Sequence, residues 1–159
     1  MKRFLLTLLV VFIANISLAK EVVTQTEKYE NGNIKYEIIS VNDGDYYKYK
    51  LYYENGQIQT SGYYNWLGVK TWDWVVYYEN GVVAFTQKFA DGEKNGDCYY
   101  YNENGTLYIK TSWKNDKKHG TWLQYDETGR LVCTKTYKRD KFIEGCSWSE
   151  DKGLLVTYP

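Results

Sequence analysis

The chain of 159 residues is poor in the residues on which most catalytic and metal sites depend. It has one histidine, His119, and three cysteines, Cys98, Cys133 and Cys146, which are spread along the chain. A catalytic nucleophile needs a nearby base that a third group holds in place, and structural zinc needs clustered Cys and His ligands. The sequence therefore predicts no metal site and no cofactor, and we expect a protein that is not an enzyme.

An excess of charge of one sign is also lacking. The chain has 20 basic and 20 acidic residues, without long runs of either. Affinity for nucleic acid depends on clustered basic residues that neutralise phosphates. Nucleic acid is therefore not expected as a partner.

Long hydrophobic runs are absent except at the N-terminus. There, two basic residues precede an apolar run at 4–13, and small residues precede Ala19, as in an export signal. A membrane-spanning helix needs about 20 apolar residues, and this run meets Asn15 first. We interpret residues 1–19 as a helical signal peptide that is cleaved after Ala19, with an uncleaved anchor as the alternative. Because no cysteine lies near the cleavage point, we expect a periplasmic or extracellular product without a lipid anchor or stable membrane insertion.

Proline and methionine occur once each, whereas the chain has 18 tyrosines, 6 tryptophans and 13 glycines. Aromatic residues favour strands over helices. Residues 20–159 have the length of one domain. The composition therefore predicts a single all-β domain.

Glycines recur at a nearly constant interval of 24 residues, with one interval of 25. Most of them end a loop such as Tyr53-Glu54-Asn55-Gly56, in which Asn and Gly close a short hairpin between aromatic and β-branched runs. The pattern predicts an elongated, single-layer, twisted antiparallel β-meander of about six hairpin repeats. The glycines are Gly32, Gly56, Gly81, Gly105, Gly129 and Gly153.

Each repeat should also contain a β-bulge. A repeat with one three-residue loop and one two-residue turn has an even number of residues, such as 24, only if one strand contains an extra, bulged residue. Gly96, Gly120 and Gly145 are the expected positions of this bulge. Side chains alternate between the two faces of a strand. We therefore expect residues at even offsets from the loop glycines to form the core face, and those at odd offsets to form the other face.

The odd-offset face is unusually rich in aromatic residues. Trp and Tyr dominate binding energy at interfaces, so this face is the predicted binding surface for a protein, a peptide or a glycan. Two structural interpretations stay open: twist that buries both faces in part, and aromatic pairs that stabilise neighbouring strands. The predicted binding residues are Trp74 and Trp122 as anchors, Tyr100 and Tyr108 between them, and Tyr49.

An open meander has two edge strands. Pairing of a partner strand, or self-association by edge addition, is therefore a second predicted route to binding.

The cysteines leave two readings open. In an oxidising compartment, Cys133 and Cys146 could lie opposite each other across the turn Arg139-Asp140 and form a disulfide. Offset parity instead places them on opposite faces, which opposes a bridge. Cys98 is expected to be unpaired in either case.

Paired carboxylates could carry acid–base chemistry or hold calcium. The candidates are Asp43 with Asp45, and Glu150 with Asp151. Such pairs are usually solvated turn residues, and His119 is expected to be one too. An envelope hydrolase is therefore kept only as an alternative.

These motifs resemble those of MORN-repeat proteins, specifically the bacterial variant type described as antitoxin components. The resemblance rests on the Tyr-Glu-Asn-Gly loops and on the run 113–125, which contains Lys117-Lys118-His119-Gly120-Thr121-Trp122. It implies a single-layer β-meander used for binding or scaffolding, with atypical repeats at the two ends. The leading hypothesis is an exported, non-enzymatic binding or scaffold protein. The alternative is an antitoxin or immunity partner of one cognate toxin.

Overall fold

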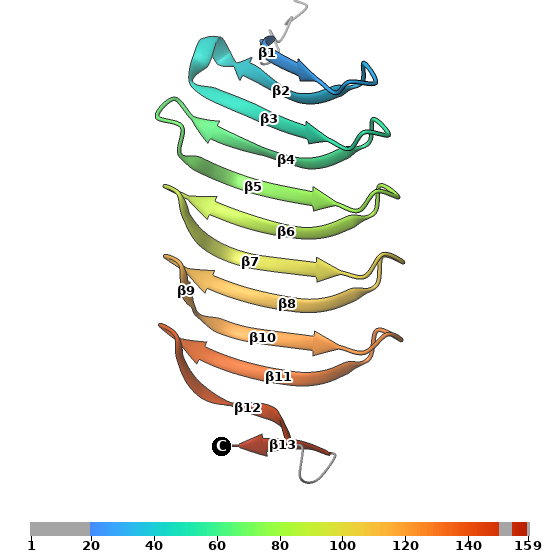
Figure 1. Cartoon of the computed structure of the whole chain (residues 1–159). Coiled ribbons are helices and arrows are strands. Elements are labelled where there is room, and N and C mark those ends of the chain that lie inside the picture. The colour runs from blue at the N-terminus through green and yellow to red at the C-terminus, as the bar shows by residue number, and fades with distance from the viewer. Residues whose placement is uncertain (1–19, 150–153, 159) are drawn as a thin grey trace, which may run out of the picture.

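The computed structural model describes residues 20–149 and 154–158. Within them, all strands lie in one antiparallel sheet in chain order, except that the short strand β9 pairs only with β8 (Figure 1). The predicted all-β meander is thus confirmed. The predicted signal peptide at 1–19 and the pair Glu150 and Asp151 lie outside the described residues. None of the described segments is a helix long and apolar enough to cross a bilayer.

The strands are β1 Glu21–Lys28, β2 Ile34–Val41, β3 Tyr46–Tyr52, β4 Ile58–Asn65, β5 Lys70–Tyr77, β6 Val83–Ala90, β7 Glu93–Tyr101, β8 Leu107–Lys114, β9 Lys117–Lys118, β10 Gly120–Tyr125, β11 Leu131–Lys138, β12 Lys141–Ser149 and β13 Leu154–Tyr158, with a short 3-10 turn at Asn42–Gly44.

The Glu-Asn-Gly loops close the hairpins as their sequence predicts. In the loop between β3 and β4, Gly56 has a φ of +86°, a region that suits glycine, and its N–H donates to the carbonyl of Tyr53 at 2.9 Å. The Asn55 side-chain oxygen accepts from the backbone N–H of Gln57, also at 2.9 Å. The loop therefore holds its shape by local hydrogen bonds.

Tyrosines at the start of these loops connect each hairpin to the next. The hydroxyl of Tyr29 donates to the carbonyl of Tyr52, that of Tyr53 to Tyr77, and that of Tyr78 to Tyr101, each at 2.7 Å. In the next loop Asn102 replaces the tyrosine, and this series of bonds ends there. Each of these bonds satisfies a part-buried carbonyl of the neighbouring unit and so helps to hold successive hairpins together.

The prediction of which residues share a face was wrong for half of each hairpin. Val76 pairs with Phe85, but the next pair is Tyr77 with Val83, so Ala84 is a bulged residue beside the loop. The same shift recurs in the four other hairpins up to Gly129, and it inverts the alternation on the strand before the glycine. Odd-offset residues before a glycine therefore share a face with even-offset residues after it.

Neither face is a closed core. Nine residues of the described chain are buried, only Cys98 among them completely, and most side chains in the sheet are half-buried. A single layer has no second sheet to cover it. Its stability must come largely from cross-strand contacts, which are dominated here by aromatic pairs.

Candidate functional site

One face of the sheet, here called the aromatic face, is defined by its cross-strand pairs. Trp74 on β5 pairs with Gln87, Gln87 pairs with Cys98, and Cys98 pairs with Thr111 on β8. Directly paired residues point to the same side of a sheet. The alternating residues of these strands and of β10 and β11 therefore form one continuous surface.

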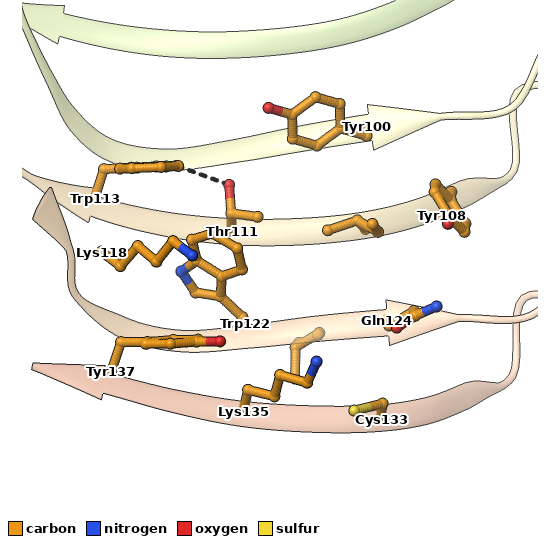
Figure 2. A pocket seen from close by; sticks show the side chains of 12 residues that line it. Tyr100, Tyr108, Thr111, Trp113, Lys118, Trp122, Gln124, Cys133, Lys135 and Tyr137 are labelled. Carbon is orange, nitrogen blue, oxygen red and sulfur yellow. Dashed lines mark hydrogen bonds between the residues drawn. The ribbon is translucent and has the colours of Figure 1, made fainter. Parts of the chain in front are cut away.

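The C-terminal part of this face contains a hollow of about 450 Å³. It lies across β7, β8, β10 and β11, and Figure 2 shows Trp113, Trp122 and Tyr137 gathered at one end, with Lys118 between the two indoles. Its lining residues are Tyr100, Tyr108, Ile109, Thr111, Trp113, Lys118, Trp122, Leu123, Gln124, Cys133, Lys135 and Tyr137.

The aromatic rings of the hollow are held in place. The indole N–H of Trp113 donates to Thr111 Oγ1 at 2.9 Å, and that of Trp122 donates to the carbonyl of Ser112 at 3.0 Å (Figure 2 draws the first bond). The ring centroids of Trp113 and Trp122 are 5.3 Å apart, and that of Tyr137 is 5.0 Å from Trp122. With their N–H groups satisfied, the indoles offer fixed apolar surfaces to a ligand.

A second hollow of about 250 Å³ adjoins the first. Both are lined by Tyr100 on β7, so the two hollows meet at this residue and follow each other across the strands. We call the two hollows together the aromatic groove. The second hollow is lined by Thr60, Lys70, Trp74, Val76, Phe85, Gln87, Phe89, Lys94 and Tyr100.

Tyr100, where the two hollows meet, is held in its neutral form. Burial, and after it the neighbouring thiol of Cys98, raises its pKa to about 12. Its ring stacks on Phe85 with centroids 5.5 Å apart. Tyr100 therefore contributes a ring face and an uncharged hydroxyl to the groove.

The structure places the five predicted binding residues on or beside this groove. Tyr100, Tyr108 and Trp122 line the larger hollow. Tyr108 is the bulged residue of its hairpin and is 42% exposed. Trp74 lines the smaller hollow but is only 5% exposed, and the ring of Tyr49 lies beside it at 6.2 Å. Trp74 thus packs within the sheet face, whereas Trp122 lines the more open hollow.

Sequence reasoning missed Trp113 and Tyr137 as part of this surface. Both stand at even offsets from their loop glycines, so they were assigned to the core face. The inverted alternation brings them beside Trp122 instead. The sequence did offer one signal: two tryptophans, Trp113 and Trp122, stand on either side of one turn.

The turn between β4 and β5 carries an exposed tryptophan, Trp66, which lines a separate hollow beside Tyr47 and Tyr64, on the same face as Trp74. The 25-residue interval arises here, because three residues, Trp66 to Gly68, replace a two-residue turn. Trp66 is 70% exposed and Leu67 63%. Trp72 stands 24 residues before Gly96, with a φ of +56°, and its ring lies 4.2 Å from that of Tyr46. A tryptophan thus occupies a left-handed position that other repeats give to glycine.

The predicted bulge glycines have the expected conformation. Gly96, Gly120 and Gly145 have φ angles of +104°, +78° and +140°. The register of β6 and β7 shifts between Gln87 and Phe89, opposite Gly96. The predicted irregularity is confirmed at this position.

Cys133 and Cys146, whose pairing the sequence left open, lie close together near the C-terminal end of the sheet. The structure pairs Cys133 on β11 with Cys146 on β12, with their Cα atoms 5.7 Å apart, a separation that a disulfide spans. The parity argument fails because the ladder between these strands ends at Lys135 and Gly145, and Cys146 follows directly after that glycine. Cys98 is buried and free, and burial raises the pKa of its thiol.

The titratable residues singled out in the sequence do not converge. Asp43 and Asp45 are exposed at the turn before β3, and Asp43 pairs with Lys20 at 3.1 Å. Contrary to expectation, His119 is half-buried between β9 and β10, with Nδ1 buried and without a partner in the described chain. Among the described residues, no group of three or more His, Cys, Asp or Glu side chains is arranged to hold a metal ion.

The N-terminal edge strand is open. All residues of β1 are exposed, including Val22 and Val23, and among the described strands it pairs only with β2. Its register shifts between Val23 and Gln25, and Thr24 donates its hydroxyl to the carbonyl of Ile38 at 3.0 Å. Such an irregularity makes the edge a poorer template for another strand.

The fold defines a repeat protein in which one hairpin unit is stacked into an open, single-layer sheet with an aromatic groove on one face. Four segments, residues 22–42, 48–65, 94–115 and 118–139, match the MORN repeat variant and together make up just over half of the chain. The chain therefore belongs to the MORN-repeat family. The segment 66–93, which contains the exposed turn and Trp72, lies between the matched repeats. No curated protein matches the chain significantly.

Proposed function

We propose that this protein is an exported, non-enzymatic binding or scaffold module that holds a protein or peptide partner in the aromatic groove. The observation that carries the proposal is the cluster of Trp113, Trp122 and Tyr137, whose rings are fixed around a hollow of about 450 Å³. Rigid Trp and Tyr side chains give contact area at low entropic cost and dominate binding energy. A glycan could stack on the same rings and is an outcome of the test below.

A capture experiment with two matched variants tests the groove. Trp122→Ala removes a ring from the groove, and Trp66→Ala removes a more exposed ring at the β4–β5 turn, which lines neither hollow of the groove. Each variant protein is immobilised and incubated with envelope extract, after its folding is verified by circular dichroism. We expect Trp122→Ala to lose the partner at least tenfold and Trp66→Ala to retain it. Loss with Trp66→Ala alone would place binding at the β4–β5 turn and contradict the proposal.

An antitoxin or immunity role is a narrower version of the same proposal. It requires one dominant partner recovered in a fixed ratio, whereas a scaffold recovers several. The groove supports either, since a toxin segment could occupy it. Quantitative mass spectrometry of the captured proteins distinguishes an antitoxin role from a scaffold role.

Export is proposed from the leader-like residues 1–19, which begin with Lys2 and Arg3. N-terminal sequencing of the protein purified from its own cells checks this. A first residue of Lys20 is expected, and a retained Met1 would contradict cleavage.

A further inference from the structure

We propose that the ligand of the aromatic groove is an extended acidic peptide that runs across the strands, with a carboxylate at every third residue. This inference rests on the proposed function and specifies the chemistry of the partner.

The groove carries a row of lysines at the repeat interval. Lys70, Lys94 and Lys118 stand at successive 24-residue steps, and each extends its ammonium over an indole. The Nζ atoms lie 4.2 Å from the ring centroid of Trp74, 4.6 Å from that of Trp113 and 4.9 Å from that of Trp122, respectively. The indoles thus fix where the positive charges stand.

These charges have no acidic counterpart in the groove. Neither hollow is lined by Asp or Glu, while Lys70, Lys94, Lys118 and Lys135 all line one of them. Within the described chain, none of the four makes an ion pair, whereas Lys110 on the opposite face pairs with Asp97 at 2.8 Å. The four lysines are half-buried. A partner that supplies carboxylates would therefore complete charge pairs that the sheet leaves open.

The spacing of the lysines selects the conformation of the ligand. Each repeat contributes two strands, which lie about 4.8 Å apart, so successive lysines stand roughly 9.6 Å apart along the groove. A polyproline II helix has three residues per turn and a rise of about 3.1 Å, so every third side chain recurs after about 9.3 Å. A β-strand presents the same face every ~6.7 Å, which does not match the spacing of the lysines. Aromatic-lined grooves are a recurrent binding mode for polyproline II segments.

The test uses three synthetic peptides of equal length and the protein purified in its native processed form. The probe repeats Pro-Pro-Glu. The first control has the same composition with its glutamates grouped together, and the second repeats Pro-Pro-Lys. Binding is followed by tryptophan fluorescence at low and at physiological salt.

We expect the Pro-Pro-Glu peptide to bind about tenfold more tightly than the grouped control, with affinity that falls as salt rises, and the Pro-Pro-Lys peptide not to bind. Lys118→Gln should weaken binding of the probe about tenfold and flatten its salt dependence. Lys114→Gln, at an exposed position beside the turn after β8, is the matched control and should leave binding unchanged.

Equal affinity for the spaced and grouped peptides would overturn the inference, as would binding of polygalacturonate without binding of the probe. If the probe does not bind but a native partner is captured and lost with Trp122→Ala, the inference fails and the proposed function stands. If neither the probe nor a groove-dependent partner binds, both fail.

Discussion

The indole of Trp74 lies directly against Gly62 on the neighbouring strand, in the space that a side chain at position 62 would occupy. Its N–H donates to the carbonyl of Tyr63 at 3.2 Å, and the ring is almost fully buried although the sheet has a single layer. A glycine thus creates the socket in which the indole of Trp74 is buried.

This relationship predicts that Gly62→Ala destabilises the fold. The added methyl group would overlap the indole, and overpacking typically costs about 1–3 kcal/mol. Urea unfolding of the variant should show a lower midpoint. Ser61→Ala, one residue earlier on the other face, is the matched control, and an equal effect of both changes would contradict the socket.

Trp72 should report backbone strain when it is replaced. At a φ of +56°, glycine is tolerated better than alanine by about 1 kcal/mol, and both replacements lose the same contact with Tyr46. Trp72→Gly is therefore expected to be more stable than Trp72→Ala by about that amount in urea unfolding. Equal stability, or a more stable alanine variant, would show that the left-handed conformation is not maintained.

We propose that Cys133 and Cys146 form a disulfide in the exported protein. Closure of a loop of this size constrains the unfolded chain and contributes about 3 kcal/mol. Reducing agent should lower the melting temperature of the wild type and of Cys98→Ser, but not that of the double variant Cys133→Ser, Cys146→Ser. A wild-type melting temperature that is insensitive to reductant would contradict the bridge.

Stability should fall at alkaline pH because half-buried tyrosines have raised pKa values. Burial first, and then the hydrogen bond that Tyr52 donates to Glu37 at 2.7 Å, raises the pKa of Tyr52 to about 12 from 10. The folded state therefore keeps the proton longer than the unfolded state. Its stabilising contribution is complete below about pH 10 and is lost as pH rises to about 12.

The variant Tyr52→Phe removes this contribution. It should be less stable than the wild type at neutral pH by about 1 kcal/mol through loss of the hydrogen bond, yet lose less stability above about pH 10. Urea unfolding across this pH range measures both. A wild type and variant with parallel alkaline declines would show that Tyr52 does not titrate as described.

The sequence was sufficient to predict the hairpins but not the faces. The spacing of the glycines located each loop. The conformational preferences of Asn and Gly predicted that each loop closes a short hairpin. The bulge at Ala84 left no mark in the sequence, because alanine has no special conformational preference there, and it inverted the alternation on which the two faces were predicted. The proposed binding residues Trp122 and Tyr100 were predicted from an incorrect division into faces, and Trp113 and Tyr137 were missed because of the same division.

Trp72 shows a second limit of the sequence pattern. The glycine of the next repeat, Gly96, predicted a positive φ at its own position, but a tryptophan 24 residues earlier gave no local signal of the same conformation. The cross-strand register agrees with the spacing, since Trp72 pairs with Phe89 and Gly96 with Trp113.

The most direct test of the central claim is hydroxyl-radical footprinting of the protein alone and with its captured partner. Modification of a side chain falls when a ligand covers it. We predict strong protection of Trp113, Trp122 and Tyr137 in the groove, and unchanged modification of Trp66 and Trp72, which line neither hollow of the groove. Protection of Trp66 and Trp72 with unchanged modification of Trp122 would contradict the assignment of the aromatic groove as the binding site.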